Sequence, residues 1–393
     1  MMRLAFHILC LVLMAISVQA QTEPIFDLRS GLRFSAAKFK DEKQGRVVFL
    51  GGSITHNPGW RDHVCKELQK RFPKTTFDFV NAGIPSMGST PGAFRLTRDV
   101  FSNGTVDLLF VEAAVNDAAN KRIHQEPLRG MEGIIRHARR LQPRLDIVMM
   151  HFVDPAKIAD YRMGRTPRVI ELHEKVADYY QIPSLNLAKE VTERLDANEF
   201  SWEDDFKDLH PSPFGQRLYS RSLIALLDAA WNQQQTGDYT FPEEPLDPFS
   251  YSQGRLVDIA RANGDENWRH VESWKPTDGA ATRAGFVNAP MLVASVPGSE
   301  LTFQFSGIGV GIFVAAGPDA GRIEYQIDGG DTRTLDLFTP WSSGLHLPWA
   351  YILDAELAPG HHALTIKIAQ TQNPDSKGHA LRIRHFLVNQ NPE

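Results

Sequence analysis

The sequence predicts a three-layer α/β/α domain followed by an all-β sandwich domain. From residue 46 to about residue 232, short apolar runs alternate with stretches of helical period. Beyond residue 252, apolar residues instead recur at every second position. Repeated alternation of strand and helix produces a parallel sheet covered on both faces, whereas a period of two is typical of strands with one buried face. We therefore expect two domains of different architecture.

Five apolar runs in the first part are interpreted as buried strands. They cover residues 46–50, 77–81, 107–112, 145–150 and 182–187. Between them, apolar residues recur three or four positions apart, as on one face of a helix; these are Trp60, Val64 and Leu68, then Leu128, Met131, Ile134, Ile135, Ala138 and Leu141, then Val169, Leu172, Val176 and Tyr180. The pattern predicts an α/β domain over residues 21–232.

Residues 233–252 contain three prolines and several acids, which predicts a linker with little to bury. Strands of period two follow it; their apolar residues are Leu301, Phe303 and Phe305, then Val310, Ile312 and Val314, then Ile323, Tyr325 and Ile327, then Leu364, Ile366 and Ile368. Asp328-Gly329-Gly330 suits a tight hairpin turn. These observations predict a β-sandwich domain over residues 253–393.

The first 20 residues are typical of a cleaved secretory signal peptide. Arg3 precedes an apolar run from Leu4 to Val18, and Ala20 offers a small residue for cleavage. We expect a secreted or periplasmic protein without a membrane anchor, because no later apolar run is long enough to cross a bilayer. The mature chain keeps only Cys65 and forms no internal disulfide. The net charge of −5 makes nucleic acid an unexpected partner.

Four polar or glycine-containing segments follow elements of the α/β domain at the edge where ligands bind in such sheets. They contain Ser53, Gly83, Asn116 and His210. A serine hydroxyl becomes a nucleophile when a neighbouring imidazole takes its proton. The N–H groups of Ser53 and Gly83 and the side-chain amide of Asn116 offer donors for an oxyanion, each worth roughly 10²-fold to 10³-fold in rate.

Each of these residues has a structural reading when taken alone. Ser53 suits a helix N-cap, Gly83 a turn and Asn116 a loop anchor. Ser53 is followed by Ile54 and Thr55, so the lipase-type G-x-S-x-G elbow is absent, and no Gly-Lys-Ser/Thr follows the strand as in a phosphate-binding loop. The joint placement of the four segments favours the catalytic reading.

The four segments GGSIT, NAGIPSMGS, AVND and DLHPSPFG resemble the four ordered blocks of the SGNH (GDSL-type) hydrolases, over residues 30–232. The resemblance implies a flavodoxin-like α/β/α fold and ester hydrolysis without a cofactor or metal. By position it makes Ser53 the nucleophile and His210 the base. Ser53, Gly83 and Asn116 become the oxyanion donors.

The histidine block departs from the family pattern, which places an aspartate three residues before the histidine. Lys207 occupies that position, with Asp208 two residues and Asp205 five residues before His210. Three alternatives follow: Asp208 orients the imidazole, Asp205 does so, or a backbone carbonyl replaces both. We favour Asp208 as the third catalytic residue.

Export, a serine esterase site and a β-sandwich together predict removal of acyl groups, expected to be acetyl, from a polysaccharide or oligosaccharide. The sandwich is similar in architecture to the jelly-roll modules attached to exported carbohydrate-active enzymes. His151 after the fourth strand and three residues of a loop-like stretch are the candidate substrate contacts: Trp341, His346 and Trp349. The alternative for the two tryptophans is that they plug the sandwich or a domain interface.

Two other functions stay open on the sequence: a lipid-directed esterase or thioesterase, and a non-catalytic glycan-binding protein. Glu112, at the end of the third strand, is expected to be a buried carboxylate that accepts hydrogen bonds from loop amides. The sequence leaves the oligomeric state open.

Overall fold

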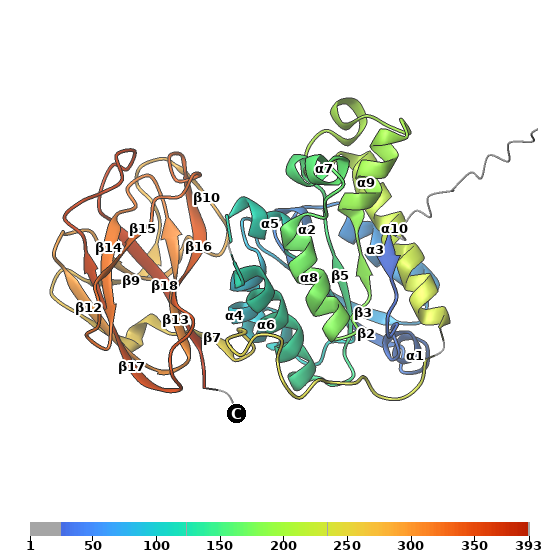
Figure 1. Cartoon of the computed structure of the whole chain (residues 1–393), viewed down its shortest axis with the longest axis horizontal. Helices are drawn as coiled ribbons and strands as arrows, with labels where there is room; N and C mark the ends of the chain where they lie inside the picture. Colours follow the sequence, from blue (N-terminus) through green and yellow to red (C-terminus); the bar gives the residue numbers. More distant parts are fainter. Residues whose placement is uncertain (1–24, 123, 234, 392–393) are drawn as a thin grey trace, which may run out of the picture.

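The computed structural model describes residues 25–391 except residues 123 and 234. An α/β half and a β half lie side by side (Figure 1). The expected signal peptide at residues 1–20 lies outside the described residues. Within the described ranges, no helix combines the length and the apolar character needed to cross a membrane.

The α/β half is built on a six-stranded sheet. Its strands are β1 (Phe26–Asp27), β2 (Gln44–Gly51), β3 (Thr76–Gly83), β4 (Leu108–Glu112), β5 (Asp146–Met150) and β6 (Ser184–Leu185). The spatial order is β1-β6-β5-β4-β2-β3, and every pair is parallel except the pair of β1 with β6. The strand order reverses between β2 and β4, and open α/β sheets bind ligands at the carboxyl end of such a reversal.

All five predicted strands are present, but the last one is shorter than the sequence indicated. β6 contains only two residues of the predicted 182–187. Pro183 before it lacks a backbone N–H, and the side chain of Asn186 after it accepts a hydrogen bond from the N–H of Lys189 and so caps the next helix.

Helices cover both faces of the sheet. The bounds are α1 (Ser35–Asp41), α2 (Ser53–His56), α3 (Trp60–Arg71), α4 (Ser89–Leu96), α5 (Ala114–Ala119), α6 (Glu126–Leu141), α7 (Pro155–Arg162), α8 (Arg168–Tyr179), α9 (Leu187–Asp196) and α10 (Pro213–Asn232), with π-helical turns η1 (Thr97–Phe101) and η2 (Trp202–Phe206). Val48 and Leu50 of β2 pack on the side of α4, α6 and α8, while Val47 and Phe49 pack on the side of α1, α3, α9 and α10. The predicted three-layer α/β/α arrangement is confirmed.

The segment that joins the halves is tied closely to the α/β half. The carboxylate of Glu132 on α6 accepts hydrogen bonds from the N–H groups of Leu246 and Asp247, at 2.5 and 3.0 Å. Tyr251 is buried, and its ring centroid lies 5.1 Å from that of Phe94 on α4. The expectation that this segment has little to bury is therefore wrong at Tyr251.

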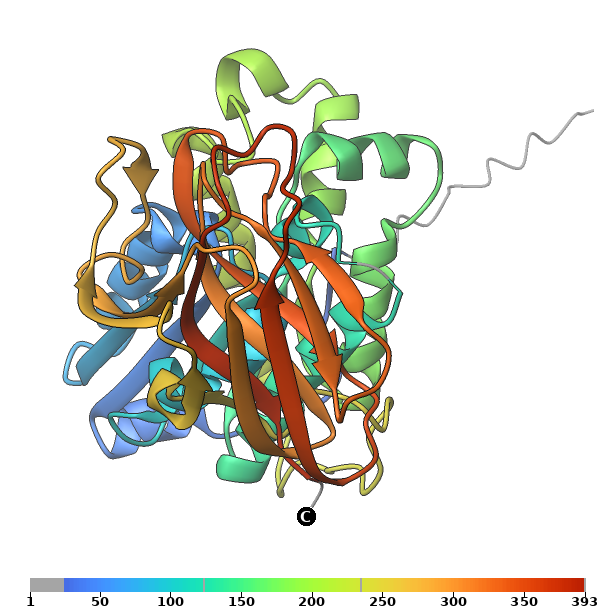
Figure 2. The ribbon, with the colours of Figure 1, turned by 90° about the vertical axis from the view of Figure 1, so that its left-hand side faces the viewer.

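The β half is a sandwich of two sheets (Figure 2). Its strands are β7 (Gly254–Val257), β8 (Ala262–Gly264), β9 (Arg269–Trp274), β10 (Ala281–Thr282), β11 (Ala289–Ala294), β12 (Glu300–Gly307), β13 (Gly309–Ala316), β14 (Arg322–Ile327), β15 (Arg333–Asp336), β16 (Leu345–Asp354), β17 (Gly360–Ile368) and β18 (Leu381–Asn389), with the 3₁₀ turn η3 (Ile259–Arg261). One sheet has the order β10-β16-β13-β18-β11-β9, with β7 also paired to β18. The other has the order β15-β14-β17-β12-β8.

The predicted alternation of the second half forms the interior of this sandwich. Phe303 of β12 stacks on Phe386 of β18 with 3.9 Å between ring centroids, which joins the two sheets. The predicted hairpin turn links β14 to β15, and both Asp328 and Gly329 have positive φ, at 53° and 68°. Positive φ at successive residues is what a tight turn of the matching twist requires.

The outer face of the larger sheet packs against the α/β half, so that the two halves share one hydrophobic cluster. Phe94 of α4 and Phe313 of β13 both belong to this cluster. Polar contacts surround it: Arg122 donates to the carbonyl of Ala350 at 2.7 Å, and Arg98 donates to His385 at 3.0 Å. Burial, with the nearby charges of Arg384 and Arg98, lowers the pKa of His385 to about 3, so this ring is neutral and can accept.

Replacement of Phe94 by alanine is expected to lower the free energy of unfolding by about 3–5 kcal/mol, because it leaves a cavity where the two halves meet. Leu141→Ala is the control, since that side chain is 45% exposed on α6 and should change stability by less than about 1 kcal/mol. Urea denaturation followed by tryptophan fluorescence measures both. Equal midpoints for the two variants would contradict the shared cluster.

Candidate active site

Four segments meet at the carboxyl edge of the sheet, where its strand order reverses. Ser53 follows β2 at the first position of α2, and Asn116 lies on α5 just after β4. Gly88 ends the loop that leads from β3 into α4. His210 lies between η2 and α10. The parallel register of β2 with β3 and β4 brings these segments together although they are far apart in sequence.

The predicted serine and histidine are in direct contact. Ser53 Oγ lies 2.8 Å from His210 Nε2, which is hydrogen-bonding distance. The turn before Ser53 depends on Gly52, because a Cβ there would lie only 1.8 Å from Asn116 Oδ1. The glycine therefore lets the loop that carries Ser53, called the nucleophile loop after the predicted role of this serine, approach α5. An imidazole in this position can remove the hydroxyl proton during attack on a carbonyl carbon.

Asp208 is the aspartate that approaches His210. Its Oδ1 accepts the backbone N–H of His210 at 2.5 Å and lies 3.8 Å from Nδ1 of the ring. The side chains of Asp208 and His210 are 67% and 44% exposed. Asp205 instead accepts the backbone N–H of Ser201 at 2.8 Å. Asp208 is therefore closer to the backbone of His210 than to its imidazole ring. Asp205 belongs to a different turn, the one that begins at Ser201.

The predicted oxyanion donor Gly83 does not fit that role. Gly83 ends β3, and its N–H donates to Asn81 Oδ1 at 3.0 Å. A Cβ at Gly83 would lie 2.6 Å from the backbone nitrogen of His56, so this glycine is needed for close packing of α2 on β3. The structure brings a different glycine to the site.

Gly88 is the glycine that sequence reasoning missed. A Cβ on Gly52 would lie 3.2 Å from the carbonyl oxygen of Met87, so the peptide unit that carries the Gly88 N–H lies beside the nucleophile loop. A Cβ on Gly88 itself would lie 2.0 Å from Asp117 Oδ1. Among the described residues, no hydrogen bond occupies this N–H. The sequence does contain a signal for Gly88: Ser89-Thr90-Pro91 is typical of a helix start, which makes Gly88 the last residue of the loop before that helix.

Asn116 lies where the sequence predicted. Its Oδ1 lies against Gly52, where an added Cβ would be only 1.8 Å away. Asn116 and the peptide unit between Met87 and Gly88 therefore both lie beside the loop that carries Ser53.

Glu112 lies directly beneath the nucleophile loop. It is 2% exposed, and its Oε1 accepts the N–H of Gly52 at 2.8 Å, as the sequence indicated. The pKa of this carboxyl is raised to about 7: burial is the main cause and the nearby carboxylate of Asp117 acts in the same direction, while the Gly52 N–H and Lys157 oppose the shift. The side chain therefore gains its proton within the neutral range.

The candidate substrate contacts fall into two groups. His151 is fully buried, with Nε2 2.6 Å from Glu174 Oε1. His346 is also buried and pairs with Asp278 at 2.8 Å. Because neither ring is open to solvent, the prediction that they touch substrate is wrong for this structure.

The two tryptophans differ in exposure. Trp349 is 8% exposed and lies within the sandwich core, with the guanidinium of Arg122 6.0 Å from its ring. Trp349 therefore packs in the interior of the sandwich, which was the structural alternative for this tryptophan. Trp341 is 50% exposed in the loop before β16 and keeps a face open to solvent.

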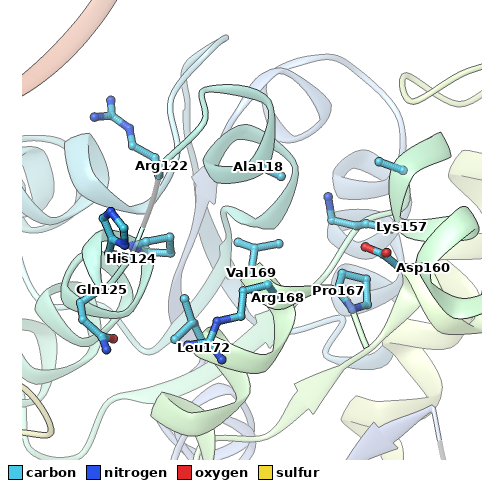
Figure 3. Close-up of a pocket in the computed structure, with 12 residues that line it drawn as sticks. Ala118, Arg122, His124, Gln125, Lys157, Asp160, Pro167, Arg168, Val169 and Leu172 are labelled. Carbon is cyan, nitrogen blue, oxygen red and sulfur yellow. The ribbon is translucent and has the colours of Figure 1, made fainter. Parts of the chain in front are cut away.

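A cavity of about 670 Å³ lies beside α5, the helix of Asn116 (Figure 3). Its lining residues are Ala118, Arg122, His124, Gln125, Pro127, Ala156, Lys157, Asp160, Pro167, Arg168, Val169 and Leu172. Neither Ser53 nor His210 belongs to this lining. Much of the positive charge is already paired, since Lys157 binds Asp154 and Arg168 binds Glu171.

The raised pKa of Glu112 predicts a loss of stability as pH rises. The folded protein binds this proton more tightly than the unfolded chain, whose carboxyl has a pKa near 4.5. The free energy of unfolding should therefore fall between about pH 4.5 and pH 7, by on the order of 3 kcal/mol from this group. Denaturation at several pH values measures the effect. Glu112→Gln keeps an acceptor for Gly52 and should remove this part of the slope; an unchanged slope would contradict the assignment.

Comparison with known proteins places the α/β half in a family. Residues 49–218 match the model of the GDSL-like Lipase/Acylhydrolase family. No curated protein matches the sequence. The chain is similar in structure to a two-domain esterase (CEX) active on acetylated mannans, co-crystallised with mannopentaose, with a TM-score of 0.71 and 18% identity over 94% of this chain and 99% of that one.

A second structure of a two-domain esterase (CEX) active on acetylated mannans has a TM-score of 0.70 and 19% identity over 93% of this chain and 99% of that one. The likeness extends over both halves and so covers the two-domain fold as a whole. The sequence match to the GDSL-like Lipase/Acylhydrolase family lies within the α/β half, at residues 49–218.

Proposed function

We propose that this chain is an exported serine esterase that removes O-acetyl groups from a polysaccharide or oligosaccharide. The observation that carries the proposal is the 2.8 Å contact between Ser53 Oγ and His210 Nε2, with Asn116 and the Met87–Gly88 peptide unit beside the Ser53 loop. A binding module has no need of a nucleophile paired with a base. Export rests on the signal-peptide pattern of residues 1–20.

In the proposed reaction, Ser53 Oγ attacks the ester carbonyl carbon while His210 Nε2 takes the hydroxyl proton. The N–H groups of Ser53 and Gly88 and the amide of Asn116 bind the oxyanion. The sugar alcohol leaves with the proton from His210. A water molecule, deprotonated by the same ring, then attacks the acyl-enzyme and releases acetate and free Ser53.

The choice of a carbohydrate ester rests on two supports. The structures similar over nearly the whole chain are of an esterase active on acetylated mannans. Trp341, in the sandwich, presents an open aromatic face of the kind on which sugar rings stack. We propose that this residue contacts the glycan.

Ser53→Ala should lower kcat for p-nitrophenyl acetate by at least about 10⁴-fold, because the nucleophile is lost. Ser306→Ala is the matched control, since its hydroxyl contacts His361 in the sandwich. Rates on acetyl and longer acyl esters, followed by acetate release from acetylated mannan and xylan, test the substrate. Activity that survives in Ser53→Ala would refute the mechanism, and a preference for long acyl chains would favour a lipid-directed esterase.

Asp208→Ala should lower kcat by about tenfold, less than the roughly 10⁴-fold seen where a buried aspartate bonds the ring directly, because Asp208 is exposed and 3.8 Å from Nδ1. Asp205→Ala is the control and should stay near wild type. Asp208→Asn keeps an acceptor for the N–H of His210, so it separates the loop contact from the charge. If both alanine variants match wild type, Ser53 and His210 work without a carboxylate.

A further inference from the structure

A buried carboxylate joins the two elements that carry the proposed oxyanion donors. Asp117 follows Asn116 on α5 and is fully buried. Its Oδ1 accepts the N–H of Ser89 at 2.9 Å, and its Oδ2 accepts the hydroxyl of Ser89 at 2.6 Å. Because Ser89 follows Gly88, this one carboxylate fixes the Gly88 loop relative to α5.

A third hydrogen bond holds the carboxylate from the neighbouring helix. His173 of α8 is fully buried, and its Nε2 lies 3.0 Å from Asp117 Oδ2. A carboxylate only accepts, so Nε2 must carry the proton and donate. The other ring nitrogen, Nδ1, is buried and has no hydrogen-bond partner among the residues that the structure describes. The ring therefore acts on its surroundings through one atom, and that atom contacts Asp117.

The position of α8 is itself fixed against the sheet. Glu174, the next residue on α8, binds His151 at the end of β5 and Arg29 at 2.6 Å in each case. Burial alone would raise the pKa of Glu174, but the hydrogen bond from His151 and the charges of His151 and Arg29 outweigh it and lower the pKa to about 2. The rings of His151 and His173 lie 5.9 Å apart between centroids. The side chain of His173 is thus presented to Asp117 from a rigid support.

We propose that His173 is a positioning residue of the oxyanion hole: it acts through Asp117 to hold the N–H of Gly88 and the amide of Asn116 in register with Ser53. The proposal rests on the proposed esterase function. Oxyanion donors contribute only when they are held where charge develops, so a loss of this support should slow the chemical step and spare ground-state binding.

Three substitutions of His173 separate this role from simple core packing. Glutamine places an amide near the position of Nε2, asparagine places it near Nδ1, and leucine removes both nitrogens. His173→Gln should keep kcat for p-nitrophenyl acetate within about threefold of wild type. His173→Asn and His173→Leu should lower it by about 10-fold to 100-fold, with KM changed by less than about threefold.

A boronic acid that forms a tetrahedral anion on Ser53 provides the second readout. Its inhibition constant should rise in His173→Asn and His173→Leu in parallel with the loss of kcat. A purely structural loss would reduce the amount of active enzyme and leave the inhibition constant at its wild-type value. Ser89→Ala, which removes one hydrogen bond to Asp117, should shift the constant in the same direction by a few-fold. If the His173 variants do not fold, an unchanged constant in Ser89→Ala overturns the proposal, because His173 is proposed to act through Asp117.

The outcomes of the two proposals are distinguishable. Equal rates and inhibition constants for the asparagine and glutamine variants, or wild-type behaviour of the leucine variant, would overturn the role of His173. Ser53→Ala, measured beside them, reports on the esterase function alone. If wild type lacks activity or Ser53→Ala retains it, the proposed function fails; if only the His173 comparison fails, the function stands and the positioning role does not.

Discussion

The rest of the structure depends on the close packing of α4 between the parallel sheet and the sandwich. All eight residues from Ser89 to Leu96 are buried. Two glycines of α6 permit this depth: a Cβ on Gly130 would lie 2.4 Å from Ser89 Oγ, and a Cβ on Gly133 would lie 3.0 Å from the side chain of Ala93 and 2.9 Å from the backbone of Tyr251. Because α4 begins at the Gly88 loop, its position sets the position of a candidate catalytic donor.

A buried ion pair at the end of α4 also holds the end of β2, the strand that precedes Ser53. Arg95 is 1% exposed and pairs with Asp99 in the π-helical turn at 2.8 Å, while its second amino group donates to the carbonyl of Gly51 at 3.3 Å. Burial lowers the pKa of the guanidinium, and Asp99 opposes that shift. A paired buried charge costs several kcal/mol when one partner is lost. The end of β2, just before Ser53, is thus braced by the same helix that the sandwich covers.

The sequence predicted the layers well because their signals are local. Strand residues of β2 face alternate sides, and the stripe of Trp60, Val64 and Leu68 is buried on α3. Ser53 and Asn116 were found because each follows a strand directly. Gly83 was predicted because it directly follows the strand. The loop after β3 is longer than those after β2 and β4, and only the fold shows that Gly88 at its end returns to the site.

The predicted substrate contacts His151 and His346 were misplaced because long-range pairings bury them. His151 follows β5 at the edge where α/β sheets bind ligands, and His346 lies near the start of β16 in an aromatic-rich stretch. Their partners, Glu174 and Asp278, are distant in sequence, and both rings are buried. Side-chain pairings between residues far apart in sequence leave no periodic pattern from which they could be predicted. The sequence favoured Asp208 but did not show how it contacts His210: with a two-residue separation, its carboxylate lies closer to the backbone N–H of His210 than to the ring.

The strand order of the sandwich has a consequence for synthesis. β18, the last strand in sequence, lies inside its sheet, where it pairs with β13, β11 and β7, and it also contacts α4. Tyr251 and β7 also lie against α4, but β7 is held in the sheet by β18. A chain that ends before residues 381–389 would therefore leave β7, β11 and β13 without their common partner, and the apolar surface so exposed is of the kind that drives aggregation of incompletely folded proteins.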